Sequence, residues 1–121
     1  SASLVGSEMC IRDRFTPAET YLMTKSPSII SAKDLEDGYT LNADGYLEYE
    51  DENAKGETSY MMSIIGTDGF GDKVVISTQS ATFKRNFEDI AGIFGDEPFT
   101  IKKISGTTKA GRPYVNCDLA Q

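Results

Sequence analysis

One segment of this chain, residues 80–94, has the apolar spacing of a helix, while the segments on both sides of it alternate like strands. Its apolar residues recur every three or four positions and include Phe83, Phe87 and Phe94, which predicts an amphipathic helix with an aromatic inner face. Ser80 is a suitable N-cap for this helix. The chain is therefore expected to fold as a β structure with one helix packed against it.

Five further segments have the two-residue alternation that is typical of strands. Three precede the predicted helix and two follow it, and they span residues 39–50, 57–67, 73–78, 99–105 and 112–119. Gly45 interrupts the first of them and predicts a β-bulge, which would exchange the inward and outward faces of the residues after it. The pattern therefore leaves open on which face Tyr46 and Tyr49 lie.

The order of three strands, one helix and two strands is the chain order of an OB-fold, a partly open five-stranded barrel. We expect an all-β OB-fold in which the helix lies between strands three and four and closes the bottom of the barrel. An α+β sandwich of the same elements is the alternative. Residues 15–30 contain two prolines and are expected to form an arm over the core, in which Thr16 and Pro17 can open a short helical turn. Residues 1–14 show no period, so we expect a non-native or disordered leader there and the OB-fold domain at residues 15–121.

The composition excludes several classes of enzyme. The chain has no histidine, which excludes histidine-based acid–base catalysis and histidine-containing metal sites. Its two cysteines, Cys10 and Cys117, are too few for a four-thiolate metal site. The acidic segment at residues 51–57 lacks the oxygen spacing of a calcium loop. We therefore expect a non-catalytic binding protein without cofactor or metal, and a carboxylate enzyme is the weakest alternative.

The charges of the chain are distributed unevenly. The formal net charge is −7, which taken alone argues against nucleic-acid binding. Residues 15–69 hold three basic and eleven acidic side chains, whereas residues 70–121 hold seven basic and six acidic ones. Any basic surface must therefore come mainly from the second half, and local charge rather than net charge decides which partner is attracted.

An OB-fold binds single-stranded nucleic acid across strands two and three and two adjoining loops, where bases stack on aromatic rings and cations lie near phosphates. The aromatic candidates are Tyr46, Tyr49, Phe70 and Tyr114. The candidate cations are Lys55, Lys73, Lys102, Lys109 and Arg112. Alternation in the fourth strand directs Lys102 and Lys103 to opposite faces, so at most one of them can face a ligand unless the other lies on the rim. Each tyrosine has the structural alternative of a buried ring with its hydroxyl at the rim, and each cation that of a solubilising charge.

Three stretches of the sequence carry a resemblance to a known family. The longest, at residues 98–121, contains Phe99-Thr100-Ile101-Lys102-Lys103-Ile104, Gly106-Thr107-Thr108, Gly111 and Tyr114. The others are Leu35-Glu36-Asp37-Gly38 followed by Ala43 and Tyr49, and Asp68-Gly69 followed by Ile76-Ser77. Together, over residues 32–119, they resemble the single-stranded DNA-binding proteins of small podophages that replicate by protein priming.

The resemblance implies an OB-fold protein that coats displaced single-stranded DNA during phage replication, without catalysis or metal. It places Tyr49 at a position where the family carries a DNA-stacking tyrosine. Two further family tyrosines, one in the loop at residues 51–57 and one in the third strand, have no counterpart here. Tyr46 or Phe70 would then have to take their place.

The partners implied by the resemblance are single-stranded DNA and the phage replication machinery, in the cytoplasm of an infected bacterial host, with a monomer favoured. The sequence has no run of about 18 apolar residues, so no membrane partner is expected. The alternative is an OB-fold module of a virion or host-takeover protein that binds another protein and no nucleic acid. Convergence of Tyr49 and Lys102 on one groove would favour DNA binding, and their burial or separation would favour the alternative.

Overall fold

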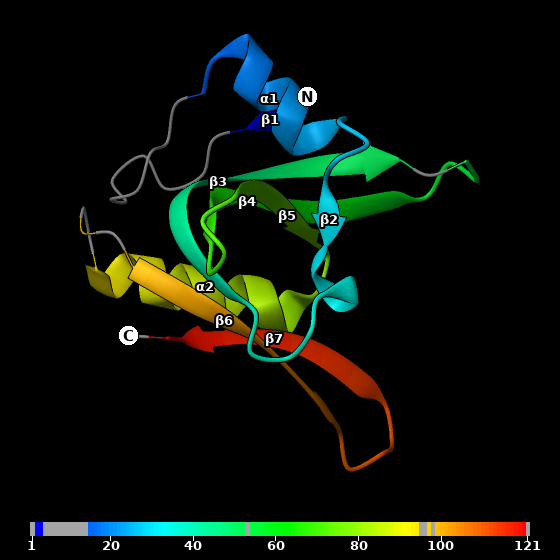
Figure 1. Cartoon of the computed structure of the whole chain (residues 1–121). Helices are drawn as coiled ribbons and strands as arrows, with labels where there is room; N and C mark the ends of the chain where they lie inside the picture. Colours follow the sequence, from blue (N-terminus) through cyan, green and yellow to red (C-terminus); the bar gives the residue numbers. More distant parts are fainter. Residues whose placement is uncertain (1, 4–14, 53, 95–96, 98, 121) are drawn as a thin grey trace.

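The computed structural model describes residues 2–3, 15–52, 54–94, 97 and 99–120 (Figure 1). Its strands are β1 (Ala2–Ser3), β2 (Ile30–Ser31), β3 (Thr40–Glu52), β4 (Thr58–Asp68), β5 (Lys73–Thr78), β6 (Phe99–Thr107) and β7 (Pro113–Leu119). Its helices are α1 (Pro17–Thr24), the short 3-10 helix η1 (Ala32–Asp34) and α2 (Ala81–Phe94). The strands expected from the sequence correspond to β3 to β7, and the expected helix corresponds to α2.

The strands form one curled sheet in the order β2-β5-β4-β3-β6-β7, and β1 pairs with β3 outside this order (Figure 1). All strand pairs are antiparallel except β2 with β5, which are parallel. Since the sheet curls into a half-barrel with α2 against it, the fold is barrel-like and mostly β. This coarse part of the prediction is confirmed.

Two details of the predicted architecture are wrong. Across the described residues the sheet has seven strands rather than five, and α1 is present in addition to α2, so that α2 lies between the fifth and sixth strands of the chain. β1 and β2 have two residues each, which is too short for an alternating pattern to show. α1 begins at a capping box between Thr16 and Glu19, which extends the predicted helical turn to a helix of eight residues. Of the expected leader, residues 1 and 4–14 lie outside the described part of the chain.

The predicted β-bulge is present in β3. The pairing of β3 with β4 shifts by one residue between Ala43 and Gly45. Because a one-residue shift reverses the alternation of side chains, Tyr46 joins Ala43 in the main core. Leu47 and Tyr49 lie in a second cluster on the opposite face of the strand. The bulge therefore determines on which face of β3 each tyrosine lies, and both Tyr46 and Tyr49 have apolar surroundings.

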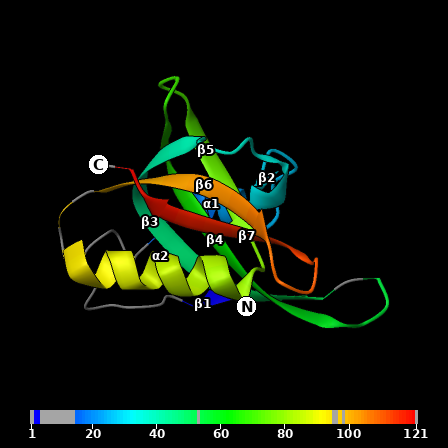
Figure 2. The same cartoon turned by 90° about the horizontal axis from the view of Figure 1, so that it is seen from below.

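α2 packs against the inner face of the curled sheet and contributes Phe83 and Phe87 to the aromatic core (Figure 2). Phe83 and Phe87 are buried, and the Phe83 amide donates to Ser80 Oγ over 3.2 Å, which confirms the predicted N-cap. The ring of Tyr46 meets Phe87 edge-on, with centroids 5.1 Å apart, and Phe99 of β6 lies 5.5 Å from Phe87. The predicted aromatic inner face of the helix is thus confirmed.

α1 covers the opposite face of the sheet, as expected of the N-terminal arm. Its Met23 is fully buried and packs in the second cluster with Leu47, Tyr49 and Ile65. Ser63 Oγ in β4 donates a hydrogen bond to the Met23 carbonyl and so fixes the helix to the strand. The centre of the sheet is therefore covered by a helix on each face.

Over the described residues, the sheet does not close into a complete barrel. β5 and β7 lie on either side of an open seam, where β2 pairs with β5. On the other side of the seam, Ser80 Oγ donates to the Val115 carbonyl over 2.9 Å, and Asn86 Nδ2 donates to the Cys117 carbonyl. The side chains of Ser80 and Asn86 thus provide hydrogen-bond donors for carbonyl groups at the edge of β7, where a further strand would otherwise pair.

Candidate functional site

A groove of about 980 Å³ runs along the open seam. The β3–β4 and β6–β7 hairpins extend to the same side of the molecule and flank this groove (Figures 1 and 2). In the view of Figure 1, β2 lies between the two hairpins. The lining residues of the groove are Ser31, Lys33 and Asp34 of β2 and η1, Asp51, Ser59 and Met61 of the first hairpin, Ser77 to Ser80 at the end of β5, and Lys103, Ser105, Pro113, Tyr114 and Val115 of the second hairpin. This volume is at the upper end of the range for ligand-binding clefts.

Hydroxyl groups dominate the polar surface of the groove. Six of the lining residues are serine or threonine: Ser31, Ser59, Ser77, Thr78, Ser80 and Ser105. The formal charges of the lining balance, because it contains two lysines and two aspartates. A ligand would therefore be held by individual hydrogen bonds and apolar contacts rather than by a strong net potential.

Tyr114 is the aromatic ring of the groove. It pairs across the sheet with Gly106, and its side chain is 38% exposed. A Cβ atom added to Gly106 would lie only 2.5 Å from Tyr114 Oη and 2.6 Å from its Cζ, so the ring crosses directly over the glycine. The absence of a side chain at Gly106 thus allows the ring to lie against the strand. The contact with Gly106 holds the ring of Tyr114 in place, and the exposed part of the ring remains accessible to a ligand.

Lys103 is the buried cation of the groove, with only 7% of the residue exposed. Its Nζ donates to the Leu35 carbonyl over 2.6 Å and lies 3.2 Å from Asp37 Oδ1. Its backbone also bonds the turn before β3, because its N–H donates to the Tyr39 carbonyl and its carbonyl accepts from Gly38 N–H. Lys103 therefore fixes the segment of the turn that borders the groove.

Asp37 accepts from two side chains of the groove wall. Ser105 Oγ donates to Asp37 Oδ1 over 2.6 Å, beside the contact from Lys103. The hydrogen bond from Ser105, followed by that from Lys103, lowers the pKa of Asp37 below its usual value. The side chain of Asp37 is also largely exposed, so Asp37 is an anion near neutral pH.

Three of the predicted cations lie at the tips of the two hairpins that flank the groove. Lys55 is exposed in the β3–β4 hairpin, and Lys109 and Arg112 are exposed in the β6–β7 hairpin. The second tip is a tight turn, in which Thr108 N–H donates to the Arg112 carbonyl over 2.8 Å. These positions suit contacts to the backbone of a polymer that lies along the groove and passes beyond its ends.

The prediction that Tyr46 and Tyr49 face a ligand is wrong for this structure. Tyr46 is 2% exposed because the bulge turns it toward Phe87, and Tyr49 is 9% exposed because α1 covers it. Burial also raises the pKa of Tyr49, whose hydroxyl lies 3.4 Å from Ser63 Oγ. Neither ring can stack on a base without a rearrangement of the core.

Three other predicted residues lie away from the groove lining. Phe70 is exposed, but it lies in the turn between β4 and β5, at the far ends of these strands from the groove. Lys73 follows the same turn, and its Nζ lies 3.5 Å from Asp44 Oδ2. Lys102 is the neighbour of Lys103 that points away from the groove. Tyr49 and Lys102 therefore do not converge on one groove.

The sequence reasoning missed Lys33, Lys103 and the hydroxyl groups of the groove. A signal for Lys103 was available, because it shares the alternation of Phe99 and Ile101, both of which are buried. Lys102 and Lys103 differ in burial as the alternation predicts, and Lys103 lines the groove in place of the predicted Lys102. No comparable signal marked Lys33, since η1 has no alternating pattern.

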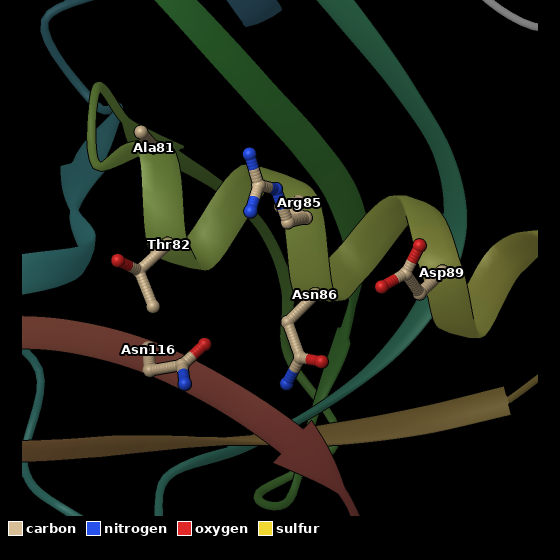
Figure 3. Close-up of a pocket in the computed structure, with 6 residues that line it drawn as sticks. All are labelled: Ala81, Thr82, Arg85, Asn86, Asp89 and Asn116. Atoms are coloured by element: carbon tan, nitrogen blue, oxygen red, sulfur yellow. The ribbon is translucent and has the colours of Figure 1, made fainter.

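A smaller pocket of about 280 Å³ lies between α2 and β7 (Figure 3). Asn86 and Asn116 line it from the two elements, and both amides bond the backbone of Cys117. Arg85 and Asp89, which also line the pocket, are both exposed. The polar character of this pocket thus follows from the way that α2 is attached to the edge of β7.

Two carboxyl groups meet between β3 and α2. Glu88 hydrogen-bonds with Glu48, and burial together with this contact raises the pKa of Glu88 to about 7. Lys84 opposes this shift, because its positive charge favours the ionised form of Glu88. Neither glutamate lines the groove. Glu88 is therefore partly protonated near neutral pH, at a position separate from the groove lining.

No protein-family model matches the chain, and neither a curated protein nor a solved structure shows significant similarity to it. None of the helices in the described residues is long and apolar enough to cross a membrane. Within the same residues, no three histidine, cysteine, aspartate or glutamate side chains come together as they would around a metal ion.

Proposed function

We propose that this protein is an OB-fold, non-catalytic single-stranded DNA-binding protein and that the strand binds in the groove along the open seam. The observation that carries the proposal is the position of Tyr114, whose ring lies over Gly106 on the wall of this groove. An exposed ring that is held in place is the feature on which a base can stack.

The order of the strands supports this interpretation. β3 to β7, with α2 before β6, have the chain order of an OB-fold, and the spatial order β5-β4-β3-β6-β7 leaves them partly open. Ligands of OB-folds bind across the second and third strands and between the first and the last hairpin loops. The corresponding elements here are β4, β5 and the two hairpins, and these are the elements that border the groove.

The chemistry of the groove sets the form of binding. Stacking of one base on Tyr114 would contribute about 1–3 kcal/mol. The hydroxyl groups can bond sugar, phosphate or base edges, and Lys55, Lys109 and Arg112 can reach phosphates beyond the ends of the groove. Because the groove itself is balanced in charge, stacking and hydrogen bonds would contribute more to binding than net electrostatic attraction does.

The biological role in this proposal is to coat strands that are displaced during phage DNA replication, alongside the replication machinery of an infected bacterial cell. This part rests on the resemblance of residues 32–119 to the podophage proteins, and Tyr114 lies within the longest of the matching stretches. The buried Tyr49 does not support it, since the stacking position that the resemblance assigns to Tyr49 is covered by α1.

A protein-interaction module is the second candidate function. The separation of Tyr49 from Lys102 favours it, and so does the balanced charge of the groove. Met61, Pro113 and Val115 also give the groove apolar surface that an extended peptide could cover. This candidate predicts no binding of single-stranded DNA at any salt concentration.

A titration of tyrosine fluorescence with oligo(dT) at low salt tests the proposal, together with a gel-shift comparison of single-stranded and duplex DNA of equal length. We expect quenching by oligo(dT) that high salt reverses and a preference for the single strand. Tyr114→Ala should weaken binding about 5- to 150-fold, the equivalent of losing one stacked base.

Tyr21→Ala is the matched control for this variant, because Tyr21 is an exposed tyrosine on α1 and does not line the groove. It should bind oligo(dT) as the wild type does. A folded wild-type protein that neither quenches nor shifts single-stranded DNA would refute the proposal and leave the protein-interaction module as the candidate.

A further inference from the structure

The carboxylate of Asp37 occupies a position at the edge of the groove where two donors converge. Ser105 Oγ donates to its Oδ1 over 2.6 Å, and Lys103 Nζ lies 3.2 Å from the same oxygen. Both donors belong to residues that line the groove. A hydroxyl and an ammonium group directed at one anionic oxygen form the contact set that a phosphate oxygen of a ligand would need.

The two donors are held in place by contacts that do not involve Asp37. Lys103 Nζ also donates to the Leu35 carbonyl over 2.6 Å, and the backbone of Lys103 bonds Gly38 and Tyr39. Ser105 belongs to β6, which pairs with β7 at this position. The donors would therefore stay near their positions when the carboxylate moves away.

Asp37 itself can move. Its side chain is 59% exposed, and it lies in the turn that ends at Gly38, whose φ is +90°. A carboxylate at the surface can turn out to solvent without leaving a cavity in the core, and its charge is then hydrated by water. The carboxylate of Asp37 can thus be exchanged for another anion, whereas Ser105 Oγ and Lys103 Nζ stay in place.

We propose that Asp37 fills an oxyanion subsite of the groove and that a phosphate of the ligand displaces it. The inference rests on the proposed function in assigning that phosphate to single-stranded DNA. The subsite as such would accept any phosphate oxyanion. Competition by the protein's own carboxylate would lower affinity for phosphate, so that a ligand must also stack on Tyr114 to bind well.

The test compares Asp37→Ala with Glu36→Ala. Both changes remove one negative charge from adjacent exposed residues of the same turn, but only the first vacates the position between Ser105 and Lys103. We expect Asp37→Ala to bind oligo(dT) about 5- to 10-fold more tightly than the wild type, which corresponds to about one unit charge contact. Glu36→Ala should change the affinity less than 2-fold.

Inorganic phosphate separates the subsite from DNA binding. Titrated into Asp37→Ala, it should shift the backbone amide resonances of Lys103 and Ser105, and the same concentration should leave those of the wild type unchanged. If oligo(dT) binds the wild type and both variants alike and phosphate moves neither resonance, the inference is wrong and the proposed function stands. If phosphate moves both resonances but no form binds oligo(dT), the subsite stands and the proposed function fails.

Asp37→Asn keeps the inference testable if Asp37→Ala does not fold, because the amide oxygen can still accept from Ser105. The charge is lost, so the exchange with phosphate becomes easier. Asp37→Asn should then bind oligo(dT) about 2- to 3-fold more tightly than Glu36→Gln. Equal or weaker binding by folded Asp37→Asn would overturn the inference.

Discussion

β3 and β7 both carry tyrosines that a strand-binding barrel could use, and the surroundings of these rings differ. β3 lies in the middle of the sheet order, with α2 on one face and α1 on the other, so Tyr46 and Tyr49 are buried although they point in opposite directions. β7 lies at the end of the sheet, and Tyr114 lies over a glycine of its single neighbour strand. The number of layers that cover a strand, rather than the alternation of its side chains, thus decides whether its tyrosines can reach a ligand.

Replacement of the two kinds of tyrosine should lower the free energy of unfolding to different extents. Tyr46→Ala removes a buried ring that packs against Phe87, and such truncations lower the free energy of unfolding by about 3–5 kcal/mol. Tyr114→Ala removes a partly exposed ring and should lower it by less than about 1 kcal/mol. Urea unfolding with unchanged m-values measures both quantities.

Tyr46→Phe is the control for this comparison, since it keeps the ring and its contact with Phe87. It should be much closer in stability to the wild type than Tyr46→Ala is, and it should bind oligo(dT) as the wild type does. If Tyr46→Ala and Tyr114→Ala destabilise the fold equally, the two strands do not differ in the way described, and Tyr114 belongs to the core.

The elements that the sequence predicted well are those with several repeats of a pattern. The long strands and α2 were predicted because their alternating or helical spacing extends over six residues or more, and Ser80 marked the start of the helix. β1 and β2 were not predicted, because a strand of two residues is too short to show a pattern and is recognised only by its pairing with a neighbouring strand. Gly45 predicted the bulge, but which face became the core depended on the position of α2, which is a property of the whole fold.

The candidate site was predicted in part, for a related reason. Tyr114 and the hairpin cations could be chosen because turns and strand ends are recognisable in a sequence. The groove also needs Lys33 from η1 and Lys103 from β6, which are 70 positions apart in the numbering and come together only when β2 pairs with β5. Asp37 belongs to one of the stretches that carry the family resemblance, but that stretch does not indicate its contacts with Lys103 and Ser105.

A methyl group at Gly106 should displace the ring of Tyr114 in β7 and leave the buried tyrosines of β3 in place. The Cβ of Gly106→Ala would lie 2.5 Å from Tyr114 Oη, so the ring must leave its place over the strand. We expect the affinity for oligo(dT) to fall about 5- to 10-fold, which corresponds to about 1–1.4 kcal/mol and is less than the loss of the whole ring. The fluorescence titration described for Tyr114→Ala measures this change.

Gly92→Ala is the matched control, because a Cβ there meets no atom within 4 Å and the residue lies in α2. It should leave the affinity unchanged and raise the stability of the helix by roughly 0.5–1 kcal/mol. Wild-type affinity for Gly106→Ala, in the presence of a clear loss for Tyr114→Ala, would show that the ring binds from a different position than the one over Gly106.

On the inner face of β3, Glu48 hydrogen-bonds with Glu88 of α2. Burial and the contact with Glu48 raise the pKa of Glu88 from 4.5 to about 7, so between these values the folded state binds more protons than the unfolded state does. The free energy of unfolding should therefore decrease as the pH rises across this window.

Glu88→Gln stays neutral at every pH, so it should be more stable than the wild type at pH 8 and similar to it at pH 5. Because Glu88 is partly exposed, solvent screening limits the gain to about 1 kcal/mol, or a few degrees in Tm. Glu50→Gln, a change at an exposed glutamate of β3 that does not act on Glu88, should alter the stability by a similar amount at pH 5 and pH 8. An equal gain for Glu88→Gln at both pH values would mean that protonation of Glu88 does not link β3 to α2.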